Sequence, residues 1–537
     1  MREYNFLLDK ALQGGLRPRG VGRNAPFFDE MKNLIPWGNV ARTPEQIQFP
    51  IEGLTLSGEW PWPQLVQSEA VTLLRDKTAI YEVDPVGWTA TEPERRYSYD
   101  AAVSEPAIAG LYKQSMLSAF GECWFLNNGG GGTWFKLPYL YDDYILRYGI
   151  GDKASPNVSA ITKHDDRLFI AGLDGGKSMY NFWFNGTRFN RVKEAWRKTA
   201  PESLFVSEDT NPFAEGNWVF WSEPNGGSDD MPFYVFLTMI GAFGYSAFDK
   251  VEELLIDSIE KKKIGMMQLP VSGAIHRMMP FGNDLLVFCE RGIFNVSMER
   301  QTGYYESKKL NTLNLCSRAA VDGIGDELVF LDGVGTLWRY YLEDRFFRSE
   351  RYDYGDHFEN LTLANVRVVR DPIRGHYYIG DGSAAYVFTG NSLGGPLEIM
   401  PTTMIDAAGV KMGYTHKSGT GQNIRLVSSP VDLMDRGKKR ITVYQLGSDG
   451  LTSLYGAVDY DYANTGQFTR GPFKPFNPEG VVFPRVSFSD GRVVIQGVVA
   501  NEEIGAQIDR IEVRYQAEDR RYVRGTKGMP GQQEQAQ

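Results

Sequence analysis

The sequence predicts a mostly β protein: a divergent, irregular β-propeller with an extended N-terminal arm and a C-terminal β-sandwich-like domain. Between Cys123 and Phe388, one pattern recurs six times: a turn, a burst of β-forming apolar and aromatic residues, and a second turn. The composition, with 13% aromatic residues and 58 glycines, favours strands joined by turns. From about Thr402 onward, several segments alternate apolar and polar residues as half-buried strands do.

Residues 1–70 are predicted to form the extended arm, because prolines and glycines punctuate them throughout. Each proline disfavours helix at its own position and at the preceding residue. Clusters such as Phe27-Phe28 are too apolar for a solvated linker, so we expect the arm to pack along another surface. Arg17, Arg19 and Trp37 are its candidate assembly contacts.

The six copies predict propeller blades over residues 71–400. Successive copies start 44, 50, 67, 43 and 49 residues apart, and a period near ~45 residues is typical of four-stranded blades. A seventh unit is expected around Val71 to Trp88. The propeller is divergent, because the chain has no Trp-Asp dipeptide of WD blades and no kelch spacing. The copies begin at Glu122, Asp166, Gly216, Asn283, Asp326 and Gly375.

An insertion, residues 231–263, occupies the interval between the third and fourth copies. Its first part, residues 231–248, is eighteen residues without a charge, which reaches the length of a membrane span. Its proline, glycines and tyrosines favour a buried hairpin or a loop covering the propeller, so no stable membrane span is expected. The second part predicts a helix, with Asp249 as N-cap, an apolar stripe, and three lysines from Lys261 at its end.

The C-terminal β domain is predicted over residues 401–524, followed by a disordered tail, residues 525–537, that is poor in apolar residues. Strands are expected at 424–431, 439–446, 481–488, 492–499 and 508–516. Ser489-Asp490-Gly491 reads as a hairpin turn between two of them.

The chain is acidic overall. The chain carries 67 acidic and 57 basic residues, a net charge of −10, so its surface as a whole repels a nucleic-acid backbone. Residues 510–527 are instead locally basic. This stretch is either a solvated strand face or a docking surface for an acidic neighbouring protein. Its candidate assembly contacts are Arg510, Arg514, Arg520 and Arg521.

No pattern in the sequence points to catalysis, so no enzyme activity, cofactor or metal site is expected. The five histidines are scattered without metal-ligand spacing, and no Gly-x-Ser-x-Gly elbow occurs. Three cysteines without Cys-x-x-Cys spacing, and an N-terminus without a signal-peptide core, favour synthesis in a reducing cytoplasm. Carboxylates at turns could serve a glycosidase, but turn aspartates usually cap backbone N–H groups. The turn carboxylates in question are Asp174, Asp326, Asp332, Asp371 and Asp381.

Three stretches together resemble a known family. They are residues 24–38 (NAPFFDEMKNLIPWG), residues 281–294 (FGNDLLVFCERGIF) and residues 508–516 (IDRIEVRYQ). With them the chain resembles the tail nozzle proteins of tailed bacteriophages, also called stabilization or tail hub proteins. The resemblance covers most of the chain, although no single short motif defines the family.

The resemblance implies a structural virion protein. Six copies would form a ring below the portal and adaptor that holds the packaged genome and provides the DNA exit channel. Its partners would be itself, the adaptor and other tail proteins, and genomic DNA passing without sequence recognition. It would be located in the virion tail after assembly in the host cytoplasm. Candidate channel or gate loops are Gly129, Gly130, Gly131 and Gly132, and the segment holding Met231, Phe233, Phe236 and Phe243.

Two alternatives stay open. A glycan-binding or glycan-cleaving propeller of the phage tail or host is favoured by the turn aspartates and by Trp183, Trp218 and Trp221, which could stack on sugars. A cytoplasmic interaction scaffold is compatible with a propeller alone.

Overall fold

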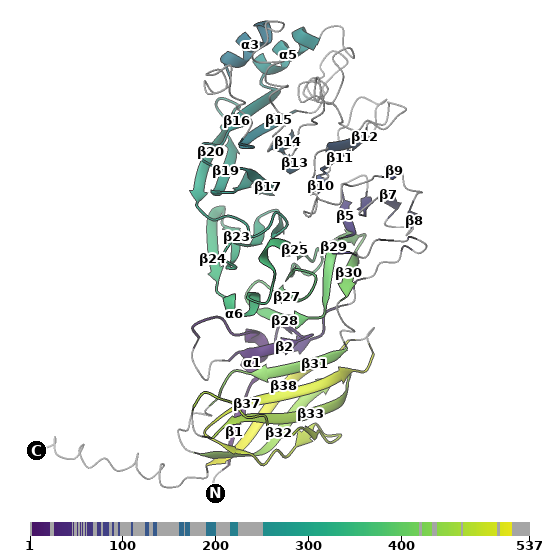
Figure 1. Ribbon diagram of the computed structural model, residues 1–537, viewed down its shortest axis with the longest axis vertical. Helices are drawn as coiled ribbons and strands as arrows, with labels where there is room; N and C mark the ends of the chain where they lie inside the picture. Colours follow the sequence, from purple (N-terminus) through teal and green to yellow (C-terminus); the bar gives the residue numbers. More distant parts are fainter. Residues whose placement is uncertain are drawn as a thin grey trace, which may run out of the picture.

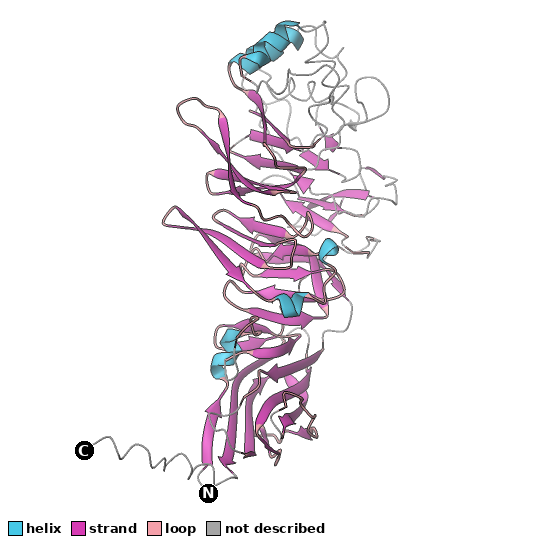
Figure 2. Ribbon diagram, turned by 60° about the vertical axis from the view of Figure 1, so that its left-hand side comes forward, coloured by secondary structure: helices cyan, strands magenta, loops and turns pink. Residues whose placement is uncertain are grey.

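The computed structural model shows an elongated, mostly β molecule, as predicted (Figure 1). Helices α3 and α5 lie at one end and the C-terminal strands at the other, with antiparallel sheets stacked between them (Figures 1 and 2). The structure describes residues 3–21, 26–45, 47, 51, 54, 56, 59–60, 62–67, 72–76, 79–84, 89–90, 95–96, 109–110, 124–127, 133–136, 160–165, 167–171, 190–199, 215–223, 251–417, 422–431, 438–462, 465–501 and 505–517.

Three four-stranded antiparallel sheets and the first four strands of a nine-stranded sheet form a propeller-like array. In each of these groups of four, every strand pairs with the next one along the chain, as in propeller blades. The first strands of neighbouring sheets contact one another, so they form the inner side of the array. The strands are β13 (Ala160–His164), β14 (Arg167–Ala171), β15 (Trp218–Ser222) and β16 (Ile264–Gln268); β17 (Ile275–Phe281), β18 (Asp284–Cys289), β19 (Gly292–Met298) and β20 (Tyr305–Asn311); β21 (Val321–Ile324), β22 (Glu327–Leu331), β23 (Leu337–Glu343) and β24 (Phe346–Tyr352); β25 (Arg367–Arg370), β26 (Tyr377–Gly380), β27 (Ala385–Phe388) and β28 (Leu393–Leu397).

Three smaller sheets continue the array. The hairpin of β29 and β30 contacts both β25 and β5, and β10 contacts β13. The sheet of β5 to β9 includes the region where the seventh unit was expected. The strands are β5 (Gln64–Gln67), β6 (Thr72–Arg75), β7 (Ala79–Asp84), β8 (Thr89–Ala90) and β9 (Arg95–Arg96); β10 (Ala109–Gly110), β11 (Trp124–Asn127) and β12 (Thr133–Lys136); β29 (Ile399–Ala407) and β30 (Val410–Lys417).

All six repeated bursts form strands, but they mark five sheets and not six. Five of them are the second strands of their sheets: β11, β14, β18, β22 and β26. The third burst is β15, which pairs with β14 in one sheet, with Phe169 opposite Trp221. Neighbouring strands buried on both faces have the same composition, so the pattern alone does not separate one sheet from two.

The bursts are continuous because their strands are buried on both faces. In β18 every residue after Asp284 is buried, and Phe288 packs edge-on against Phe330 of the next sheet at 5.4 Å between ring centroids. Cys289 ends this strand, and burial raises the pKa of its thiol to about 12. Such packing between sheets produces the non-alternating pattern that defines the repeat.

The helix expected after Asp249 is α5 (Val251–Glu260), which buries Leu255 and Ile259. The uncharged segment before it, residues 231–248, lies outside the described residues. Helix α3 (Asn190–Arg197) was not predicted. It packs on α5, and the Lys198 ammonium lies 3.0 Å from the Glu260 carboxylate. Two short helical turns follow β24: α6 (Gly355–Phe358) and η4 (Leu363–Asn365).

The C-terminal domain is a sandwich of two antiparallel layers. Ile441 and Tyr444 of one layer and Ile495 of the other belong to one buried cluster. The first layer contains β1 (Glu3–Leu7), β3 (Ile35–Trp37), β4 (Val40–Arg42), β38 (Gln507–Ala517), β32 (Lys439–Asp449), β35 (Val481–Val482) and β36 (Ser487–Phe488). The second contains β2 (Phe28–Lys32), β31 (Asn423–Ser428), β37 (Asp490–Val499), β33 (Leu451–Asp461) and β34 (Lys474–Pro475).

Three expectations for this domain differ from the structure. Ser489-Asp490-Gly491 is not a hairpin turn: β36 pairs with β32 and β37 pairs with β31 and β33, so the chain crosses there between the layers. Strand β33 was not predicted. Residues 399–417 form the hairpin that packs on the propeller-like array, which moves the start of the sandwich to about β31.

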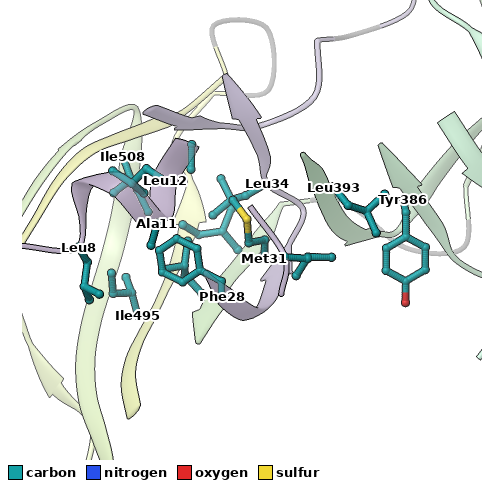
Figure 3. Close-up of a cluster of buried hydrophobic side chains, with 14 of the residues drawn as sticks. Leu8, Ala11, Leu12, Phe28, Met31, Leu34, Tyr386, Leu393, Ile495 and Ile508 are labelled. Atoms are coloured by element: carbon teal, nitrogen blue, oxygen red, sulfur yellow. The ribbon is translucent and has the colours of Figure 1, made fainter. Parts of the chain in front are cut away.

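The N-terminal segment, residues 3–45, is built into the sandwich and is not simply an extended arm. It contains the helix α1 (Asp9–Gly14), which ends where Gly15 adopts a φ of 72°. Its strand β2 lies between β28 and β31 and joins a blade and a sandwich layer into one nine-stranded sheet. Figure 3 shows the cluster beneath it, in which Leu12, Phe28 and Met31 are fully buried.

Candidate functional site

The predicted assembly contacts are divided between the N-terminal segment and β38. Arg17, Arg19, Trp37, Arg510 and Arg514 are described, and each contacts other residues of the same chain. Their role in contacts between subunits stays a prediction. The following candidates lie outside the described residues: Gly129, Gly130, Gly131, Gly132, Met231, Phe233, Phe236, Phe243, Arg520 and Arg521.

Arg19 attaches the N-terminal segment to the propeller-like array. Its guanidinium lies 2.7 Å from the carboxylates of both Asp356 and Glu359, around helix α6. The Nε2 of His357, in the same helix, lies 3.1 Å from the carbonyl oxygen of Arg17. Burial lowers the pKa of His357, so its ring is neutral and can donate this hydrogen bond at neutral pH.

Arg17 contributes to a second attachment, centred on Asp29 of β2. The Arg17 guanidinium lies 3.2 Å from one oxygen of Asp29, and that of Arg492 lies 3.1 Å from the other. Lys32 of the same strand pairs with Glu398 at 2.6 Å. The strand that joins blade and sandwich is therefore bound by side chains as well as by its backbone.

Trp37 lies close to two guanidinium groups. The carbon atoms at the centres of Arg42 and Arg374 lie 5.0 and 5.1 Å from the centroid of its ring, close enough for cation–π attraction. His376 packs edge-on at 5.0 Å between ring centroids. Burial lowers the pKa of His376.

Beside Trp37 lies a charged network that connects three distant parts of the chain. The Lys411 ammonium in β30 binds Asp371, which precedes the β25–β26 turn, and lies 2.9 Å from Glu45 of the N-terminal segment. Glu45 also accepts a hydrogen bond from Arg374 at 3.0 Å. Burial opposes ionisation of Glu45, but hydrogen bonds from Lys411 and Arg374 outweigh it and hold its pKa below the ordinary value.

This junction network, comprising Glu45, Asp371, Arg374 and Lys411, was not predicted. Its members are far apart in the sequence, and each one alone looks like a surface charge. The sequence alone indicates only that Asp371 is an aspartate of a turn. A lysine in the first residues of β30, before the buried Met412, was the one available signal, because buried lysines require a partner.

Arg510 and Arg514 lie on β38, two positions either side of Glu512. Both guanidinium groups bind its carboxylate, with Arg514 Nε at 2.9 Å from Oε1. The hydrogen bond from Arg514 is the main cause that lowers the pKa of Glu512, which is therefore ionised at neutral pH. The Glu512 side chain is only 2% exposed, whereas those of Arg510 and Arg514 are 53% and 39% exposed. The two arginines therefore form the accessible surface.

The features that favoured a glycan site have structural roles where they are described. Asp332 accepts hydrogen bonds from the N–H groups of Val334 and Thr336 and from the Trp338 indole. Asp371 and Asp381 likewise accept backbone N–H groups of their own turns. Trp218 and Trp221 are buried within the β13–β16 sheet. Asp174 and Trp183 lie outside the described residues, and Asp326 is exposed.

The described residues show neither a cluster of metal ligands nor a membrane-spanning helix. No group of three or more His, Cys, Asp or Glu side chains in this part of the chain is arranged to hold a metal ion. Among the helices of the same residues, none combines the length and the apolar character needed to cross a membrane.

Comparisons with known proteins identify no family. No protein-family model matches the chain, and no significant match is found among curated proteins. One similar solved structure is the extracellular domain of the putative hybrid two component system BT4673 from B. thetaiotaomicron. The TM-score is 0.34 at 9% identity, and the match covers 82% of this chain and 47% of the other, so this chain spans about half the length of that protein. Another is an exo-β-1,3-galactanase from Phanerochaete chrysosporium with galactose, with a TM-score of 0.25, 10% identity, and coverage of 86% and 96%. Both TM-scores lie below 0.5 and carry no argument about function.

Proposed function

We propose that this chain is a structural subunit of a bacteriophage tail, which assembles as a six-membered ring below the portal and adaptor and provides the exit channel for the packaged genome. The observation that carries the proposal is the nine-stranded sheet joined by β2. Strand β2 has four paired residues with β31 and one with β28, Met31 opposite Gly395, so main-chain pairing links the blade and the sandwich through this strand. A ring that contains DNA under pressure requires wall elements of this kind.

Charge and attachment give further support. The net charge of −10 suits a channel wall along which DNA slides without binding. Arg19, the junction network and the ion pairs of Asp29 bind the N-terminal segment to the propeller-like array and the sandwich. We place the protein in the virion tail, assembled in the host cytoplasm, with the adaptor and other tail proteins as neighbours.

The test is the mass and the negative-stain image of the purified protein, alone and recovered from particles. We expect a ring with six-fold symmetry, an open axis and a mass six times that of the chain. A protein that stays monomeric in solution and is absent from particles would overturn the proposal.

The glycan-active alternative keeps little support among the described residues. Its candidate tryptophans Trp218 and Trp221 are buried, and Asp332, Asp371 and Asp381 bind their own turns. The same preparation, incubated with a panel of host polysaccharides, is expected to show neither binding nor cleavage. Saturable binding to one of them would restore this alternative.

A further inference from the structure

Strand β1 lies at an edge of the first sandwich layer, next to β38. The Leu8 N–H donates to the Ile511 carbonyl at 2.9 Å, and the register places Tyr4 opposite Tyr515. In an antiparallel ladder, alternate residues direct both main-chain groups toward the same neighbour. Counting back from Leu8, the even-numbered residues of β1 therefore bond to β38.

The odd-numbered residues of β1 direct their main-chain groups the other way. Glu3, Asn5 and Leu7 each present an N–H and a C=O on the outer side of the strand. Among the described residues, no strand pairs with this side. The Leu7 side chain is exposed as well, at 52%. The outer side of β1 is therefore an open sheet edge that carries an apolar side chain.

The strands at the other edges of the sandwich differ from β1. The second layer ends in β34, which has two residues and includes Pro475. In the first layer, β35 has two residues, and Pro36 lies within β3. The remaining edge is joined to the blade through β2. Short strands and prolines protect edges against pairing with other chains, whereas β1 has five residues and no proline.

The sheet face beside this edge is basic. Residues directly opposite each other share a face, so Asn5 lies on the face of Arg514, and Glu3 on the face of Gln516 and Arg440. Arg510 and Arg440 are exposed there, and the Arg514 side chain is 39% exposed. Glu512 lies between Arg510 and Arg514, is buried, and forms ion pairs with both. Glu3 is also exposed on this face, but the three arginines outnumber it, so the accessible charge is positive on balance in a chain of net charge −10.

We propose that the outer edge of β1 binds an extended acidic segment of a neighbouring protein, which adds to the sheet as a further strand. The odd-numbered main-chain groups supply the hydrogen bonds. Carboxylates at alternate positions of the segment lie on the same face as Arg510 and Arg514, and the apolar residues between them lie on the opposite face, where they cover Tyr4 and the end of the core. The identification of the neighbour as another tail protein rests on the function proposed above, whereas the chemistry of the edge does not.

The test uses the purified full chain and two labelled eight-residue peptides that alternate glutamate with valine or lysine with valine. Fluorescence anisotropy should show at least about tenfold tighter binding of the glutamate peptide. Asn5→Pro removes an outward N–H and leaves every bond to β38, so this variant should fold and lose at least about tenfold in affinity. Asn5→Ala keeps the N–H and is the matched control, with unchanged affinity. Equal binding to Asn5→Pro and Asn5→Ala, or no binding to the unchanged chain, would overturn the proposal.

Hydrogen exchange keeps the proposal testable if Asn5→Pro misfolds. In the unchanged chain, the amides of Asn5 and Leu7 should exchange rapidly alone and at least about tenfold more slowly with the glutamate peptide. Those of Tyr4 and Phe6 should be slow in both cases. Rapid exchange of Asn5 and Leu7 in the presence of saturating peptide contradicts strand addition. Peptide binding without ring formation would refute only the proposed function, and ring formation without peptide binding would refute only the edge site.

Discussion

Replacing Lys411 by methionine removes the cation at the centre of the junction network. The Lys411 side chain is 8% exposed and lies against Asp371, which is 2% exposed, and Glu45. Methionine has a similar length and no charge. The substitution therefore leaves the cavity filled and two carboxylates without their shared partner.

The magnitude follows from what each carboxylate retains. Removing one partner of a buried ion pair costs about 3–5 kcal/mol. Asp371 keeps the backbone N–H groups of Ile373 and Arg374, and Glu45 keeps the Arg374 guanidinium. We therefore expect a loss at the lower end of that range, about 3 kcal/mol.

The assay is urea unfolding of the full chain, followed by tryptophan fluorescence. A molecule of several sheets need not unfold in two states, so the comparison is between variants measured under identical conditions. The matched control is Arg348→Gln, whose partner is Glu343 and whose side chains are 55% and 57% exposed. It should cost less than about 0.5 kcal/mol. A Lys411→Met midpoint equal to that of the control would refute the reasoning.

Three further outcomes are expected from the same kind of measurement. Tyr444→Phe should leave the free energy of unfolding unchanged or raise it by up to about 2 kcal/mol, because the Tyr444 hydroxyl is buried and has no hydrogen-bond partner among the described residues; a clear loss of stability would contradict this. Burial lowers the pKa of His376 in the folded protein. The contribution of His376 to stability is therefore complete above its pKa in the unfolded chain, about 6.5, and is lost as the pH falls through its lower pKa in the folded protein. The unchanged chain should therefore lose more stability than His376→Gln between pH 7 and pH 5, and parallel curves would argue against it. Met31→Ala empties a fully buried position in β2 and should cost about 2–5 kcal/mol in urea unfolding, whereas a cost below 1 kcal/mol would show that the cluster collapses around it.

The strands of the propeller-like array could be predicted because their signal is local. A burst such as residues 327–331 is buried on both faces, so it is apolar throughout and bounded by turns. Helix α5 could be predicted from the apolar stripe in its own sequence. The third repeated burst was misassigned because spacing along the chain does not reveal that Trp221 lies opposite Phe169 in the same sheet.

The N-terminal segment and the junction network could not be predicted in detail because their partners are distant in sequence. The strand β2 has five residues, and nothing within it indicates that β28 and β31 lie on its two sides. Glu45, Asp371 and Lys411 meet only when the blade, the hairpin and the N-terminal segment are assembled. The position of Arg510 and Arg514 on one exposed face did follow from the period-two alternation of β38.

The pairing of β1 with β38 sets an order for biosynthesis. Leu7 is made 505 residues before its partner Glu512. At about 5–20 residues per second, the N-terminal strand waits roughly 25–100 s for its neighbour. During that interval Leu8, Leu12 and Phe28 have no sandwich core to enter. The blades can therefore fold before β1 joins β38, a step that a chain terminated before β38 cannot complete.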